Sequence, residues 1–105
     1  MASKSIRLRA SNKDGVATVK ALITHPMETG LRKDKKTGKM VPAHFIQTVS
    51  GKHNGQEVLL AEWGGAVSKN PYLSFQFAGA KAGDAVELTW ADNNGATDTE
   101  TTKVR

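Results

Sequence analysis

The residue types best able to do chemistry in this sequence gather in one segment, HPMETGLRKDKKTGKMVPAHF, at residues 25–45. It holds five of the fifteen basic residues, two of the three histidines, two of the three methionines and two of the three prolines. Imidazole nitrogen with thioether sulfur is a ligand set that copper accepts, and a basic segment suits anionic partners. Metal binding, anion binding and partner binding are therefore the functions to weigh.

A metal site here would use His25, Met27, Met40 and His44. Their spacing matches no compact ligand motif. The alternative is that the two histidines cap the strands flanking the segment, while the two methionines fill apolar gaps beneath it. We favour this alternative and predict that the chain binds no metal and needs no cofactor, which titration with Cu(I) or Zn(II) can check.

Catalysis finds little support in the residue types present. The chain has no cysteine, and no serine lies in a nucleophile-elbow pattern. Its carboxylates are few and fall next to turns or on strand faces expected to be exposed. The sequence therefore predicts a protein that is not an enzyme and has no catalytic residues.

The net charge of +5 comes almost entirely from one short stretch. Residues 32–39 carry five basic residues against one aspartate, whereas the remainder carries ten basic and nine acidic residues. A small nucleic-acid-binding protein with a basic loop is the alternative function to consider. Proteins that bind single strands interleave aromatic with basic residues, and residues 25–44 contain no aromatic. We therefore predict no nucleic-acid binding, which filter binding at low salt would check.

Seven short strands are expected to position this segment, because apolar and polar residues alternate and no helical period appears. We expect the strands at about residues 6–9, 17–23, 45–49, 57–63, 72–77, 86–90 and 97–104. Turn sequences such as Asp14-Gly15 and Asn54-Gly55 separate them. The pattern predicts an all-β fold, an antiparallel β-sandwich forming a single domain over residues 1–105.

The expected core consists of apolar residues that alternate along these strands. We predict it to contain Val19, Ile23, Phe45, Val49, Phe75, Phe77 and Trp90. Phe45, Gln47 and Val49 are expected to share one strand face. The last strand, rich in threonine with Asp98 and Glu100, is polar on both faces, which predicts an edge strand.

The segment itself is expected to fold back as a long basic hairpin loop. Pro26 and Pro42 restrict the backbone at its two ends, and Thr37-Gly38 indicates a hairpin tip. A long loop on a sandwich commonly serves recognition. Our hypothesis for the partner-binding residues is His25, Met27, Arg32, Lys33, Lys35, Lys36, Met40 and His44.

Three stretches of the sequence resemble one known family. THPMETGLRKDKKTGKMVPAHFI at residues 24–46 is similar to the hallmark segment of the SoxZ family, and SKNPYLSFQFAGAKAGD (68–84) and ELTWADNNG (87–95) also resemble it. The matching hallmark positions are His25, Pro26, Met27, Glu28, Thr29, Gly30, Leu31, Arg32, Pro42, His44 and Phe45.

The resemblance implies an immunoglobulin-like sandwich and a role in thiosulfate oxidation by the Sox system. It implies a heterodimer with SoxY, which carries the sulfur substrate on a C-terminal cysteine, and transient contact with other Sox enzymes. No catalytic residue is carried over.

The resemblance also implies a periplasmic protein exported together with SoxY. The start, MASKSIRLRA, has no apolar core of a secretory signal, and no apolar run reaches the ~20 residues of a membrane helix. We therefore expect no signal peptide of its own and no membrane contact. When SoxY is absent, an apolar strand face of this chain would be left uncovered, and two copies of the chain could then pair as a homodimer.

Overall fold

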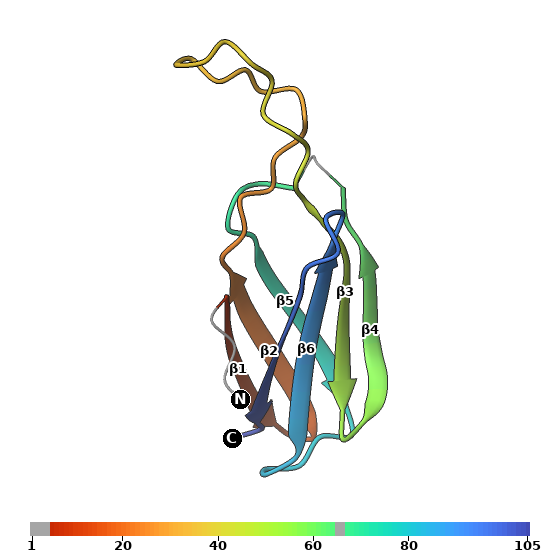
Figure 1. Ribbon diagram of the computed structural model, residues 1–105. Helices are drawn as coiled ribbons and strands as arrows, with labels where there is room; N and C mark the ends of the chain where they lie inside the picture. Colours follow the sequence, from red (N-terminus) through yellow and green to blue (C-terminus); the bar gives the residue numbers. More distant parts are fainter. Residues whose placement is uncertain (1–4, 65–66) are drawn as a thin grey trace.

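The computed structural model describes residues 5–64 and 67–105, which form seven strands in two antiparallel sheets (Figure 1). The strands are β1 (Ile6–Lys13), β2 (Val16–Ile23), β3 (Ile46–His53), β4 (Gln56–Glu62), β5 (Tyr72–Ala78), β6 (Ala85–Asp92) and β7 (Thr97–Lys103). One sheet has the order β1-β2-β5 and the other β4-β3-β6-β7. The predicted all-β sandwich is confirmed, and the arrangement is consistent with an immunoglobulin-like fold. Among the described residues, no helix is long and apolar enough to cross a membrane.

The turns β1–β2 and β3–β4 follow from their sequences. Asp14 and Gly15 have φ of 54° and 82°, and Asn54 and Gly55 have φ of 50° and 84°. Two successive residues with positive φ give the tight turn whose twist matches that of the flanking strands. Residues 1–4, part of the segment inspected for an export signal, and residues 65–66 lie outside the described residues.

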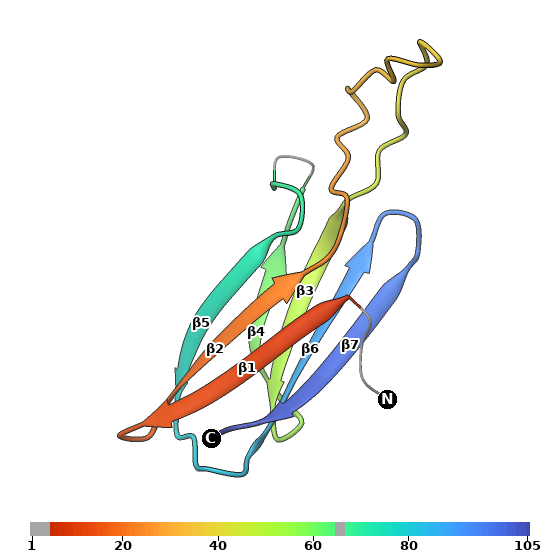
Figure 2. The same ribbon diagram turned by 90° about the vertical axis from the view of Figure 1, so that its left-hand side faces the viewer.

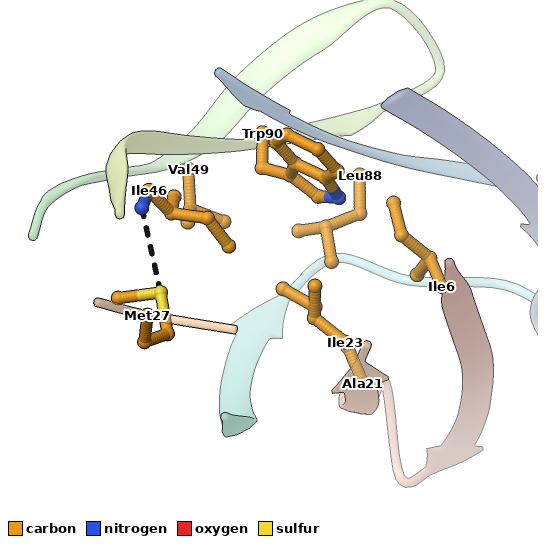
Figure 3. Close-up of a cluster of buried hydrophobic side chains, with 8 residues drawn as sticks. All are labelled: Ile6, Ala21, Ile23, Met27, Ile46, Val49, Leu88 and Trp90. Atoms are coloured by element: carbon orange, nitrogen blue, oxygen red, sulfur yellow. Dashed lines mark hydrogen bonds between the residues drawn. The ribbon is translucent and has the colours of Figure 1, made fainter. Parts of the chain in front are cut away.

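The core lies between the two sheets, where alternate residues of facing strands meet (Figure 3). In β2 the residues Ala17, Val19, Ala21 and Ile23 all point inward and are at most 1% exposed. Four predicted core residues are confirmed as buried: Val19, Ile23, Val49 and Trp90. The other three, Phe45, Phe75 and Phe77, are half-buried and pack against the core from its margin.

The expected face of β3 was wrong. Ile46 and Val49 are both fully buried, whereas Gln47 is exposed. The register between β3 and β6 shifts between Ile46 and Thr48, which marks a bulge. A bulge opposes two residues of one strand to one of the next, so a strict alternation from Phe45 onward cannot place the side chains beyond it.

The expected edge strand is confirmed. β7 pairs only with β6 among the described strands and lies at the end of its sheet. Asp98, Glu100 and Lys103 place charges along it, and charged side chains protect an edge from pairing with another chain.

Gly51 provides a test of how tightly the sheets pack. A Cβ at this position would lie 3.0 Å from Cζ of Phe75 and 3.4 Å from Cβ of Leu59. We expect Gly51→Ala to lower the free energy of unfolding by about 1–3 kcal/mol, because the core must shift to admit the methyl group. Gly64→Ala is the matched control, since a Cβ there meets nothing within 4 Å. Equal urea midpoints for the two variants would contradict the prediction.

Candidate functional site

Residues 24–45, which we call the arm, project beyond one end of the sandwich (Figures 1 and 2). Its two sides are joined by antiparallel bridges between Glu28 and His44 near the base and between Lys33 and Met40 near the tip. The molecule is accordingly elongated, with extents of 53 × 25 × 19 Å. The prediction that the segment folds back on itself as a hairpin is confirmed.

The tip of the arm is an ordered, exposed turn. The Asp34 carbonyl accepts a hydrogen bond from the Gly38 amide at 2.8 Å, and the Asp34 carboxylate accepts one from the Lys36 amide at 2.8 Å. Lys33, Lys35, Lys36 and Lys39 are all exposed around this turn. The tip thus carries four exposed lysines and one carboxylate, Asp34.

Arg32 differs from these lysines because its charge is compensated within the arm. Its guanidinium donates to both carboxylate oxygens of Glu28, with Nε–Oε2 and Nη2–Oε1 distances of 3.0 and 2.8 Å. This hydrogen bonding lowers the pKa of Glu28 below its ordinary value and raises that of Arg32. The cationic character of the tip therefore rests on the lysines.

Two apolar side chains lie open to solvent on the arm. Leu31 is 81% exposed and Met40 is 53% exposed. The expectation that Met40 fills an apolar gap was wrong. Exposed apolar side chains beside cations are the composition of a surface that contacts another protein.

Met27 anchors the arm to the core, as expected for a methionine that fills an apolar gap. It is 5% exposed, and its Sδ accepts a hydrogen bond from the Ile46 amide at 3.4 Å (Figure 3). Its φ is 49°, a left-handed conformation that side chains other than glycine rarely adopt. The chain thus accepts local strain where the arm leaves the sandwich.

A cluster of two histidines and one aspartate, His25, His44 and Asp92, lies at the base of the arm. Nε2 of His25 and Nε2 of His44 both donate to Oδ2 of Asp92, at 3.1 and 2.8 Å. The other carboxylate oxygen of Asp92 accepts hydrogen bonds from the amides of Asn94 and Ala96, at 3.0 and 2.9 Å. Asp92 is 4% exposed and His25 3%. The end of β6 thereby holds both sides of the arm.

The carboxyl group of Asp92 is ionised at neutral pH. Burial by itself would raise its pKa, but the hydrogen bonds from His25, His44 and the two amides outweigh burial and lower the pKa to about 2. Its folded pKa is therefore below its ordinary value of 3.8. By linkage, Asp92 stabilises the fold above pH 3.8, and that contribution is lost as the pH falls toward about 2.

We predict that the difference in unfolding free energy between wild type and Asp92→Asn shrinks as the pH falls from about 4 to about 2. Urea unfolding at a series of pH values measures it. Glu62→Gln, on an exposed carboxylate of β4, controls for general acid effects. A difference that stays constant across this window would contradict the assigned pKa.

The same three side chains offer ligand atoms that lie within 4.8 Å of one another, close enough to hold a metal ion. The protonation of His25 argues for hydrogen bonding instead. Nδ1 of His25 accepts a hydrogen bond from the Met27 amide at 3.1 Å, so the ring proton lies on Nε2. A metal at Nε2 would place that proton on Nδ1, facing the Met27 N–H. Absence of metal stays a prediction that titration with Zn(II) tests.

Two asparagines complete the attachment of the arm. The side chain of Asn93 accepts from the Phe45 amide at 2.8 Å and donates to the Ala43 carbonyl at 2.9 Å. The side chain of Asn70 accepts from the His25 amide at 3.0 Å. Neither asparagine is among the residues predicted from the sequence to act at the arm. Their extra role depends on contacts across 45 and 48 positions of the chain, which no local pattern reveals.

The predicted partner-binding residues fall into two groups. His25 and Met27 are buried and bonded within the chain, and half-buried His44 is held by Asp92, so these three position the arm. The exposed members, Arg32, Lys33, Lys35, Lys36 and Met40, lie along the outer arm. Partner contact remains a prediction for that exposed group, to which the structure adds Leu31.

Comparison with known proteins identifies the family of this chain. A search of curated proteins finds none that resembles the sequence. The model of the family described as "Sulphur oxidation protein SoxZ" matches residues 6–103, which include all seven strands and the arm. The chain therefore belongs to the SoxZ family and has a role in the Sox system of sulfur oxidation.

Proposed function

We propose that this chain is the non-catalytic subunit of the SoxYZ sulfur carrier. It binds SoxY, which bears the sulfur substrate on a C-terminal cysteine, and helps present that cargo to Sox enzymes during thiosulfate oxidation. Family membership supports this assignment. The observation that carries it is the arm, whose base is locked to the sandwich by Asp92 while its cationic and apolar outer part stands in solvent.

The residues present support a docking role rather than chemistry on sulfur. The chain has no cysteine, so a thiol-bound sulfur adduct belongs on another polypeptide. The two histidines at the base of the arm both donate a hydrogen bond to Asp92, which is buried. We therefore propose that the subunit supplies a shaped surface and no catalytic group.

Because the base of the arm is held in one conformation, the arm should bind a partner at a lower entropic cost. A loop already held in one conformation loses less conformational entropy when a partner docks. Leu31 and Met40 would provide apolar contact with SoxY, and the lysines of the tip would attract anionic sulfonate or thiosulfonate cargo and the acidic surfaces of Sox enzymes. We further propose that the subunit works in the periplasm, exported in complex with SoxY.

Size-exclusion chromatography and calorimetry with purified SoxY test the proposal. We expect a one-to-one complex, and we expect Leu31→Ser with Met40→Ser to weaken it about tenfold or more, since buried apolar anchors dominate interfaces. Leu60→Ser, on a side chain of β4 that is 62% exposed, is the control. Failure of the wild-type chain to bind SoxY, or turnover of thiosulfate by the isolated chain, would refute the proposal.

A further inference from the structure

The outer face of the sheet β1-β2-β5 carries a second cationic surface, separate from the arm. Figure 2 shows this sheet in front of the other, with its outer face toward the viewer. Strand pairing places its outward side chains in four rows across the strands: Arg7, Leu22 and Tyr72; Arg9, Lys20 and Ser74; Ser11, Thr18 and Gln76; and Lys13, Val16 and Ala78. Four of these twelve side chains are cations and none is a carboxylate.

Three of the four cations, Arg7, Arg9 and Lys20, lie in two neighbouring rows and are not compensated by neighbours. Arg9 and Lys20 lie directly opposite one another on paired strands. Like charges in such a pair destabilise a sheet. All three side chains are exposed, and none of the ion pairs between described residues involves them.

On the outer face of the other sheet, opposite charges rather than like charges face one another across strands. On its outer face Lys52 lies opposite Glu57 on one neighbouring strand and Glu87 on the other. Opposite charges across strands stabilise a sheet, and the chain uses this arrangement there. The unbalanced face of β1-β2-β5 is therefore a local departure that costs stability, as expected of a surface kept for binding.

The apolar members of the face indicate what kind of ligand it suits. Leu22 and Tyr72 lie directly opposite one another and are 42% and 61% exposed. Two adjoining shallow hollows are lined in part by Arg9 and Lys20, and the second also by Arg7, Leu22 and Tyr72. Arginine and tyrosine are the residues enriched at protein–protein interfaces. An open, shallow face of this kind fits a protein surface better than a small anion, which needs a deep cradle of donors.

We propose that the outer face of β1-β2-β5 is a docking surface for a partner protein that presents aspartate or glutamate carboxylates beside an apolar side chain. Arg7, Arg9 and Lys20 pair with the carboxylates, and the apolar side chain packs on Leu22 and Tyr72. This surface is independent of the arm, whose own cations lie on the projecting hairpin (Figure 1).

Poly-L-glutamate is the probe, added to the full chain at constant ionic strength and followed by amide chemical shifts. We expect the shifts to fall on β1, β2 and β5. We also expect the triple variant Arg7→Gln, Arg9→Gln, Lys20→Gln to weaken binding about five- to tenfold, as expected for three exposed ion pairs. The control variant Lys52→Gln, Lys81→Gln, Lys103→Gln removes the same charge from exposed positions elsewhere and should bind like wild type.

Three results would overturn the proposal. Equal weakening in the two triple variants would mean that net charge alone attracts the probe. Shifts confined to residues 24–45 would assign the binding to the arm. Saturation of the same face by inorganic sulfate at matched ionic strength would mean a small-anion site. Because the probe contains no SoxY, each of these outcomes is independent of whether the chain binds SoxY.

Discussion

Replacement of Asp92 by alanine should lower the free energy of unfolding by about 3–5 kcal/mol, because it removes one partner from a buried charged hydrogen-bond cluster. The side chains of His25 and His44 and the amides of Asn94 and Ala96 all lose their acceptor. Such a loss is a large part of the total stability of a small domain. Urea unfolding followed by fluorescence measures the change.

The same replacement should also loosen the base of the arm. The amides of Glu28 and His44 each donate to the other residue's carbonyl, at 2.6 and 2.9 Å. The side chain of His44 in this bridge is itself hydrogen-bonded to Asp92. We expect hydrogen exchange at these two amides to speed up more than exchange in β2. Asp92→Asn, which keeps one acceptor oxygen, should show the same order of effects at smaller size if the alanine variant does not fold.

Asp34→Ala is the matched control for Asp92→Ala. Asp34 also accepts a hydrogen bond from a backbone amide, but it lies at the tip of the arm and no histidine contacts it. Its replacement should change the free energy of unfolding by less than about 0.5 kcal/mol, as is usual for surface positions. Equal urea midpoints for the two alanine variants would show that the cluster does not stabilise the fold.

If the proposed function holds, removal of the lysine charges at the tip should slow association of this chain, in complex with SoxY, with a Sox enzyme that presents an acidic surface, about tenfold at low ionic strength. The variant that tests this prediction combines Lys33→Gln, Lys35→Gln and Lys36→Gln. Charges at the end of a projecting arm act on the encounter of two proteins, and salt screens their effect. Stopped-flow association at several salt concentrations measures the on-rate and its salt dependence.

Arg32 provides an internal control for this prediction. Its guanidinium is already paired with Glu28, so Arg32→Gln should change the on-rate less than replacement of any one of the three lysines. The variant Lys52→Gln, Lys81→Gln, Lys103→Gln removes three charges from the sandwich and should also leave the rate near that of wild type. On-rates that are unchanged in the lysine variant at low salt would count against electrostatic attraction by the tip.

The elements of this fold could be predicted from sequence because they are encoded locally. Alternation of apolar and polar residues marks each strand, and pairs such as Asn54-Gly55 mark tight turns. Where alternation is interrupted the prediction fails, as at the bulge after Ile46. Met40 was misplaced for a related reason, since an apolar side chain on an irregular segment has no period that assigns it to a face.

The sequence by itself determined the strands, the position of the arm and the family, because periodicity, turn chemistry and a long distinctive segment all lie along the chain. Only the tertiary structure decided how the arm is held. Asp92 is 67 residues from His25 and 48 from His44, and the three meet because the sheet of β2 packs on the sheet that contains β6. The tertiary structure also decided where positive charge is concentrated on the sandwich. The net charge of the sandwich residues is close to zero, but the pairing of β1 with β2 places Arg7, Arg9 and Lys20 next to one another on one face.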